Sequence, residues 1–123
     1  MEQSLQTMKA LSDMNRLRVV SALRNYDELC ACQITELLQV TGATASRHLS
    51  VLHRAGLVDS RKEGRWIYYR LTVSAENEAL FDWLEIALAG SEKLKEDEQA
   101  LETIVETTRE DLCRKQRGER CCP

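Results

Sequence analysis

Apolar residues recur at helical spacing in four groups within residues 1–56. Asp13 suits the N-cap of the second group, and Gly56 suits the end of the fourth. The third helix is short and ends near Thr41-Gly42, so the third and fourth helices are expected to form a helix-turn-helix. The four groups are Leu5, Met8 and Leu11; Leu17, Val20 and Leu23; Ile34, Leu37 and Leu38; and Ala45, Leu49 and Leu52.

The pattern after Gly56 changes to that of strands. Residues 57–71, LVDSRKEGRWIYYRL, place β-branched and aromatic residues on both sides of Glu63-Gly64, which is a favourable two-residue hairpin turn. A helix-turn-helix followed by a hairpin is a winged helix. We therefore predict a mainly α fold with a small β-hairpin, of the winged helix-turn-helix type.

The last third of the chain predicts helices with two apolar stripes. Gly90-Ser91 is the expected break, which divides a DNA-binding and sensing domain, residues 1–89, from a C-terminal helix and cysteine-containing tail, residues 90–123. The second stripe recurs at roughly heptad spacing, which predicts a homodimer through the terminal helices; alternatively, it covers its own domain. The stripes are Leu80, Trp83, Leu84, Ala87 and Leu88, and Leu94, Leu101, Ile104, Val105, Thr108 and Leu112.

Charge is unevenly distributed along the chain. The formal net charge is −3, yet cations dominate between Arg47 and Arg70, and acidic residues dominate beyond Ser74. A basic middle segment suggests a face for phosphates. The first residues lack the apolar run of a signal peptide and no stretch reaches transmembrane length, so we expect a cytoplasmic protein without membrane contact.

The second helix of a helix-turn-helix enters the major groove, and its first residues reach base edges. Duplex operator DNA is therefore the expected partner, with guanine as a bidentate target for Arg47. His53 is expected to be ordinary helix surface, and a solvated basic hairpin is the alternative interpretation of the wing. The expected DNA contacts are Thr44, Ser46, Arg47 and His48 on the helix and Arg61, Lys62 and Arg65 on the wing.

The five cysteines raise a separate question. Cys30 and Cys32 lie one residue apart just before the third apolar group, and the others are Cys113, Cys121 and Cys122. In a reducing compartment clustered thiols suggest metal or redox chemistry more than a disulfide framework. On a regular helix residues two apart do not share a face, so Cys30 suits the apolar face and Cys32 does not. One ion bridging both thiols would then require the first helical turn to be open or distorted.

Enzymatic chemistry is not expected from this sequence. It contains no visible Ser/His/Asp set, glycine-rich phosphate loop or acid pair, and residues 29–45 contain no histidine to activate a thiol. We therefore expect a protein that is not an enzyme and has no permanent cofactor.

Three segments of the chain resemble a known family. MKALSDMNRLRVVSALR, ELCACQITELL and TASRHLSVLHRAGLVDSRKEGRWIYYRL resemble the arsenic-responsive ArsR branch of the ArsR/SmtB winged-helix metalloregulators, over roughly residues 5–88. The resemblance implies a homodimeric repressor that leaves its operator when a toxic metal or metalloid binds. Cys30 and Cys32 match the first two cysteines of the branch's sensing motif, whereas Thr35 occupies the place of the third.

The missing third cysteine leaves the inducer open. Inorganic As(III) and Sb(III) favour three sulfurs, so Cys113, Cys121 or Cys122 would have to supply the third; a monoalkylated As(III) has two open valences and needs only the pair. Soft species are favoured in either case. The alternatives are Cd(II) or Pb(II), and a thiol-redox response without a metal. Capture of a ligand by Cys30 and Cys32 is expected to unwind or tilt the third helix and so change the DNA-reading geometry.

Overall fold

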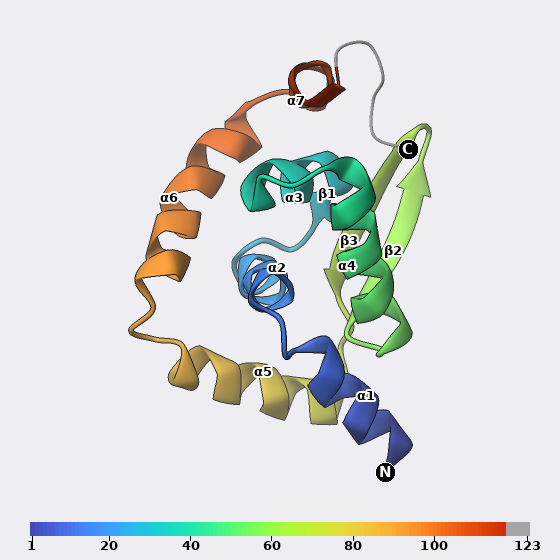
Figure 1. Cartoon of the computed structure of the whole chain (residues 1–123), viewed down its shortest axis with the longest axis vertical. Coiled ribbons are helices and arrows are strands. Elements are labelled where there is room, and N and C mark those ends of the chain that lie inside the picture. Colours follow the sequence, from blue (N-terminus) through green and yellow to red (C-terminus); the bar gives the residue numbers. More distant parts are fainter. Residues whose placement is uncertain (118–123) are drawn as a thin grey trace.

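The structure of this chain is a computed structural model that describes residues 1–117. Helix α2 lies in the middle, with the other elements arranged around it (Figure 1). The helices are α1 (Glu2–Ala10), α2 (Met14–Asn25), α3 (Ala31–Leu38), α4 (Gly42–Arg54), α5 (Ala75–Ala87), α6 (Glu92–Glu106) and α7 (Arg109–Arg117), and the strands are β1 (Leu29–Cys30), β2 (Val58–Glu63) and β3 (Trp66–Leu71).

The helix-turn-helix forms as predicted, and its caps explain the boundaries. The Asp13 carboxylate accepts hydrogen bonds from the backbone N–H groups of Asn15 and Arg16, which starts α2. Helix α3 ends at Gln39 with a φ of 55°, and the Thr41 hydroxyl then accepts from the Thr44 N–H to start α4. The inward positions of α4 are confirmed, because Ala45, Leu49 and Leu52 are all buried.

The wing belongs to a three-stranded antiparallel sheet with the order β1-β3-β2. Glu63 pairs with Trp66, so the turn is Gly64-Arg65, one residue later than the sequence pattern indicated. Gly64 has a φ of 62°, a left-handed conformation that favours glycine at this position. The short strand β1 was not predicted, and it pairs Cys30 with Tyr68.

The predicted apolar face of α5 is partly wrong. The buried residues of α5 are Phe81 and Leu84, whereas Trp83 is 61% exposed. Helix α5 packs against α2, and Phe81 and Leu84 belong to the core cluster whereas Trp83 does not. An apolar surface therefore remains on α5 outside the core.

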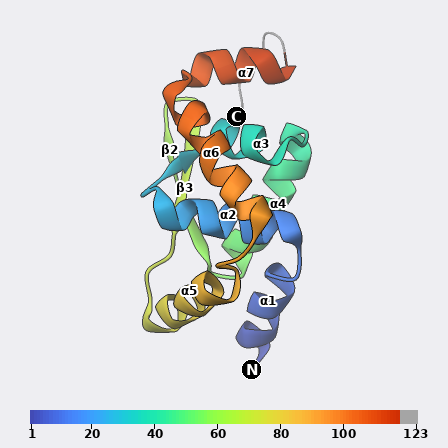
Figure 2. The same ribbon diagram turned by 90° about the vertical axis from the view of Figure 1, so that its left-hand side faces the viewer.

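The C-terminal stripe packs within the chain. Leu101, Ile104 and Leu112 are buried in the same core cluster as residues of α2 and α3, and α6 crosses both of those helices (Figure 2). The stripe divides between α6 and α7, which are separated at Thr107-Thr108. The boundary expected between residues 89 and 90 falls in the turn between α5 and α6, and the segment beyond it shares the core of the segment before it.

A buried ion pair fixes α6 to the centre of the fold. The Arg18 guanidinium donates to both carboxylate oxygens of Asp97, at 2.9 and 3.0 Å, and also to the backbone carbonyl of Leu37 at the end of α3. Loss of either partner would leave a buried charge unpaired, at a cost of about 3–5 kcal/mol. No helix among residues 1–117 has the length and apolar character needed to cross a bilayer.

Candidate functional site

Cys30 and Cys32 converge at the junction of β1 and α3, with their Sγ atoms 3.1 Å apart. Helix α3 begins after Cys30, so the two sulfurs approach each other without distortion of a regular helical turn. Cys30 is the N-cap residue, with φ −71° and ψ 151°, so it precedes the first helical turn and its side chain can turn toward Cys32. Both side chains are fully buried, which also corrects the expectation that Cys32 lies off the packed face.

The backbone around the pair is held by local hydrogen bonds. The Cys30 N–H donates to Gln33 Oε1 at 2.7 Å, which fixes the start of α3. Thr35, which stands where the family's third cysteine would be, is buried and donates its hydroxyl to the Ala31 carbonyl at 2.8 Å. Cys30 and Cys32 both lie at the N-terminus of α3, the end of a helix that stabilises negative charge.

The sulfur geometry suits a soft ligand. Two sulfurs that each lie about 2.3 Å from one ion, the length of a zinc–thiolate bond, are ~3.3 Å apart at a right-angled corner. The 3.1 Å separation of Cys30 and Cys32 is close to that value. Within residues 1–117, no three His, Cys, Asp or Glu side chains form a ready-made metal cluster. The pair can therefore serve as a two-sulfur clamp whose further ligand is recruited on binding.

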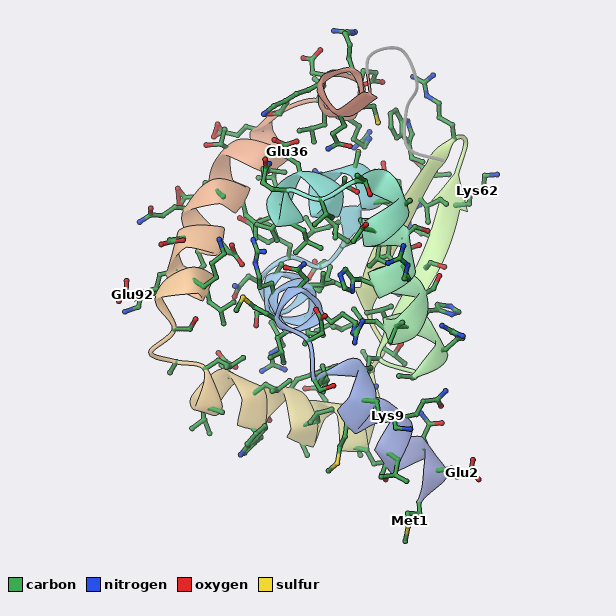
Figure 3. The ribbon with its side chains drawn as sticks, in the orientation of Figure 1. Met1, Glu2, Lys9, Glu36, Lys62 and Glu92 are labelled. Carbon is green, nitrogen blue, oxygen red and sulfur yellow. The ribbon has the colours of Figure 1, made fainter. Side chains whose placement is uncertain are left out.

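Helix α7 lies over the thiol pair. Gln116 Nε2 donates to the Cys32 carbonyl at 2.9 Å, and Lys115 Nζ donates to Glu36 Oε2 at 2.7 Å. Figure 3 places Glu36 on the side of α3 that faces α7. Burial raises the pKa of Glu36, but the hydrogen bonds from Lys115 and Gln116 outweigh this effect and hold its pKa below the ordinary value.

The other three cysteines divide between the inside of the fold and its undescribed end. Cys113 lies on α7 and is fully buried, in the same cluster as Cys30 and Cys32. Cys121 and Cys122 lie outside the described residues.

The predicted DNA-reading residues lie on helix α4 and on the β2–β3 hairpin, but they are not equally accessible. Ser46 and Arg47 on α4 are exposed, whereas Thr44 is half-buried in the capped first turn. His48 is also half-buried, and its Nδ1 atom lies 3.2 Å from Nη1 of Arg16, a contact that the sequence did not reveal. Of these helix residues, Arg47 and Ser46 are therefore placed best to touch a ligand outside the fold.

The wing cations are exposed and differ in their partners. Lys62 points away from the hairpin (Figure 3), and the Arg65 guanidinium lies 4.9 Å from the Trp66 ring. Arg61 is held by Glu63 at 2.8 Å and by Glu28 at 2.6 Å. The hydrogen bond from Arg61 lowers the pKa of Glu28. Glu28, two residues before Cys30, is a member of this site that sequence reasoning missed.

An exposed apolar surface lies at the opposite end of the molecule from α7. Leu5 and Met8 on α1 are 50% and 69% exposed, and Ile86 on α5 is 78% exposed, beside the exposed Trp83. Helices α1 and α5 lie together at that end in both views (Figures 1 and 2). Single exposed apolar residues are ordinary, but a group of large ones on two neighbouring helices is typical of an interaction surface.

Similar proteins match the part of the chain that carries the thiol pair and the helix-turn-helix. The family described as bacterial regulatory protein, arsR family, matches residues 13–60. The cadmium resistance transcriptional regulatory protein CadC of Listeria innocua is 49% identical over 61 residues, 50% of this chain and 51% of that protein. The arsenical resistance operon repressor of Bacillus subtilis is 35% identical over 79 residues, 64% of this chain and 75% of that repressor.

The fold comparison agrees with the sequence comparison. A homodimeric winged helix-turn-helix DNA-binding domain from Mycobacterium bovis aligns with a TM-score of 0.63 at 27% identity, over 74% of this chain and 82% of that domain. The predicted winged helix is therefore confirmed. The chain spans about half the length of several of the curated metal-resistance regulators that it matches.

Proposed function

The chain belongs to the arsR family of bacterial regulatory proteins, and we propose that it is a dimeric cytoplasmic repressor that a thiophilic metalloid releases from operator DNA. The inducer is As(III), Sb(III) or a trivalent organoarsenical, bound by Cys30 and Cys32. The observation that carries this proposal is the 3.1 Å separation of their buried sulfurs at the start of α3, the helix that precedes the recognition helix.

The DNA surface in this proposal consists of α4 and the wing. Arg47 reads a guanine in the major groove, while Ser46 and Thr44 contact bases or phosphates there. Lys62, Arg65 and Arg61 contact phosphates or the adjacent minor groove. His48 acts with Arg16, to which it is close, rather than alone. The name of the similar Mycobacterium bovis domain, a DNA-binding domain, supports this assignment.

The dimer in this proposal forms through α1 and α5. Two copies would bury the exposed residues Leu5, Met8, Trp83 and Ile86 against each other, which satisfies an otherwise unpartnered apolar surface. The similar Mycobacterium bovis domain is homodimeric. A two-fold dimer presents two α4 helices to half-sites about 34–36 Å apart. This interface differs from the one predicted from the C-terminal stripe, because the apolar residues of α6 cover the chain's own core.

The switch follows from where the thiols lie. Cys30 is paired through β1 with Tyr68 of the wing, and Cys32 lies in the first turn of α3, which packs on α4. An ion that draws both sulfurs toward itself therefore pulls on the wing and on the helix-turn-helix at once. A change in the angle between these two elements lowers the affinity for an operator that both must reach.

A second inducer class has specific support. The similar Listeria innocua protein is a cadmium resistance regulator, so a Cd(II)- or Pb(II)-responsive repressor is the alternative. The closeness of the two sulfurs also makes a redox response feasible, in which peroxide takes two electrons from the pair and leaves Cys30 and Cys32 joined by a disulfide. The three mechanisms differ in which reagent releases the DNA.

The test is a titration of operator-bound protein followed by fluorescence anisotropy. The operator is a duplex selected in vitro on the ligand-free protein. The reagents are arsenite, antimonite, methylarsenite, cadmium, lead and peroxide, applied to the wild type and to Cys32→Ser. We expect trivalent arsenic and antimony to release the wild type at the lowest concentrations, and Cys32→Ser to need about 100-fold more. Release by cadmium or peroxide alone would contradict the metalloid assignment.

A further inference from the structure

Three residues of α7 form one stripe that faces α3 and β3. Arg109, Cys113 and Gln116 are spaced i, i+4 and i+7, so they lie on one side of the helix. The two ends of this stripe have defined contacts. Arg109 lies 5.5 Å from the ring of Tyr68, the strand partner of Cys30, and Gln116 donates to the carbonyl of Cys32 at 2.9 Å.

Cys113 lies between these two anchors. The residue one turn before it is above the partner of Cys30, and the residue one turn after it is bonded to Cys32. Its side chain is fully buried and belongs to the cluster that contains Cys30 and Cys32. One end of this helix face contacts the strand partner of Cys30 and the other end is bonded to Cys32, so the buried thiol between them is directed toward the pair.

We propose that Cys113 of the same chain is the third sulfur ligand of the site formed by Cys30 and Cys32. The inference rests on the proposed function and specifies how trivalent inorganic arsenic is held. Each of the three thiols gives a proton to one hydroxide of arsenite, so three S–As bonds form, three waters leave and arsenic stays trivalent. Methylarsenite has two hydroxides, forms two S–As bonds with Cys30 and Cys32, releases two waters and does not require Cys113.

Recruitment of Cys113 as the third ligand involves a movement of α7. No closed three-ligand cluster exists among residues 1–117, so Cys113 must approach the pair when arsenite binds. The ion pair that links α7 to α3 resists this movement little, because Lys115 is an exposed side chain and Glu36 is its only ion-pair partner among the described residues. Helix α7 then closes on α3, which adds a movement that a two-sulfur ligand does not cause.

The test counts the sulfurs on bound arsenic by X-ray absorption and measures operator release on the same full-length samples. The variants are Cys113→Ser, Cys113→Ala and the control pair Cys121→Ser/Cys122→Ser, which removes the other thiols of the C-terminal segment. We expect three sulfurs in the wild type and in the control, and two in both Cys113 variants. Arsenite should release the Cys113 variants only at a roughly 100-fold higher concentration, while the methylarsenite response is unchanged.

The outcomes separate this inference from the proposed function. Three sulfurs in both Cys113 variants, or two in the control pair, would overturn the assignment of Cys113 while leaving the Cys30–Cys32 site intact. Loss of the methylarsenite response in both Cys113 variants would also overturn it, because the residue would then be needed for more than the third bond. Circular dichroism on Cys113→Ala, which keeps the buried position apolar, checks that the fold is retained.

Discussion

Glu28 and Arg61 are joined by two hydrogen bonds, of 2.6 and 2.7 Å, between the start of β1 and the middle of the wing. Tyr68 pairs with Cys30 on one side and with Arg61 on the other, so a straight row of residues crosses the sheet from the thiol pair to the wing. The Arg61 guanidinium lies 4.5 Å from the Tyr68 ring. A ligand at Cys30 is therefore two strands away from a cation of the proposed DNA surface.

The first prediction concerns this connection. Glu28→Gln removes the partner that ties Arg61 to β1, so Arg61 becomes available to phosphate and operator affinity without ligand should rise several-fold. The ratio of affinities without and with arsenite, about 5–150-fold for typical allosteric coupling, should fall. Glu63→Gln is the matched control, because Glu63 also binds Arg61 but lies at the wing tip. Equal loss of coupling in both variants would contradict the role of Glu28.

The second prediction separates base reading from phosphate contact. Arg47→Ala should weaken operator binding by about 1–3 kcal/mol and relax the preference at one base pair, because a bidentate contact is lost. Lys62→Ala should weaken all sequences alike and reduce the salt dependence by about one counterion. Anisotropy titrations at several salt concentrations, on the operator and on single-base variants, distinguish the two. Identical behaviour of the two variants would contradict the assigned roles.

The winged helix could be predicted from sequence because its signals are local. Asp13, Gly56 and the inward spacing of α4 report caps and faces that depend on neighbouring residues only. The geometry of the thiol pair could not be predicted from sequence, because β1 has only two residues and owes its extended backbone to pairing with Tyr68 across the sheet. The prediction from sequence took Cys30 as helical rather than as the N-cap, and it therefore directed the Cys30 side chain away from Cys32.

The C-terminal apolar stripe shows the same limit of prediction from local sequence pattern. An apolar face at helical spacing indicates that a helix packs against something, and the partner is decided by tertiary contacts. Leu101 meets the chain's own core, whereas Ile86, which was not part of any predicted stripe, is exposed. The docking of α7 through Gln116 joins residues 84 positions apart, a separation at which sequence pattern carries no signal.

The third prediction tests the dimer surface. Ile86→Glu places a charge in the proposed α1–α5 interface, where burial without a partner is costly, so the dimer should dissociate and operator affinity should fall by about 100-fold or more. Sedimentation equilibrium measures the change. Val105→Glu is the control, because Val105 is a partly exposed apolar residue on α6. Dissociation by Val105→Glu but not by Ile86→Glu would move the interface to α6.

The fourth prediction concerns the pH dependence of α7 docking. The pKa of Glu36 in the folded chain is below its ordinary value of 4.5, chiefly because hydrogen bonds from Lys115 and Gln116 outweigh the effect of burial. A depressed pKa means that docking is fully stabilised above the ordinary value and is weakened as the pH falls through the lowered one.

Hydrogen exchange of residues 109–117 measures this release. We expect protection to be constant near neutral pH and to decrease below about pH 4.5. Glu36→Gln lacks the titrating group, so its protection should be lower at neutral pH and should change less on acidification. The same acid transition in Glu36→Gln and in the wild type would assign the release to other groups.

The central claim is that a ligand on Cys30 and Cys32 releases operator DNA, and the double variant Cys30→Ser/Cys32→Ser tests it most directly. It retains the DNA surface and Cys113, Cys121 and Cys122, so any response of the remaining thiols stays visible. We predict that it binds the operator as tightly as the wild type and stays bound at arsenite concentrations about 100-fold above those that release the wild type. Release of the double variant at the wild-type arsenite concentration would contradict the account.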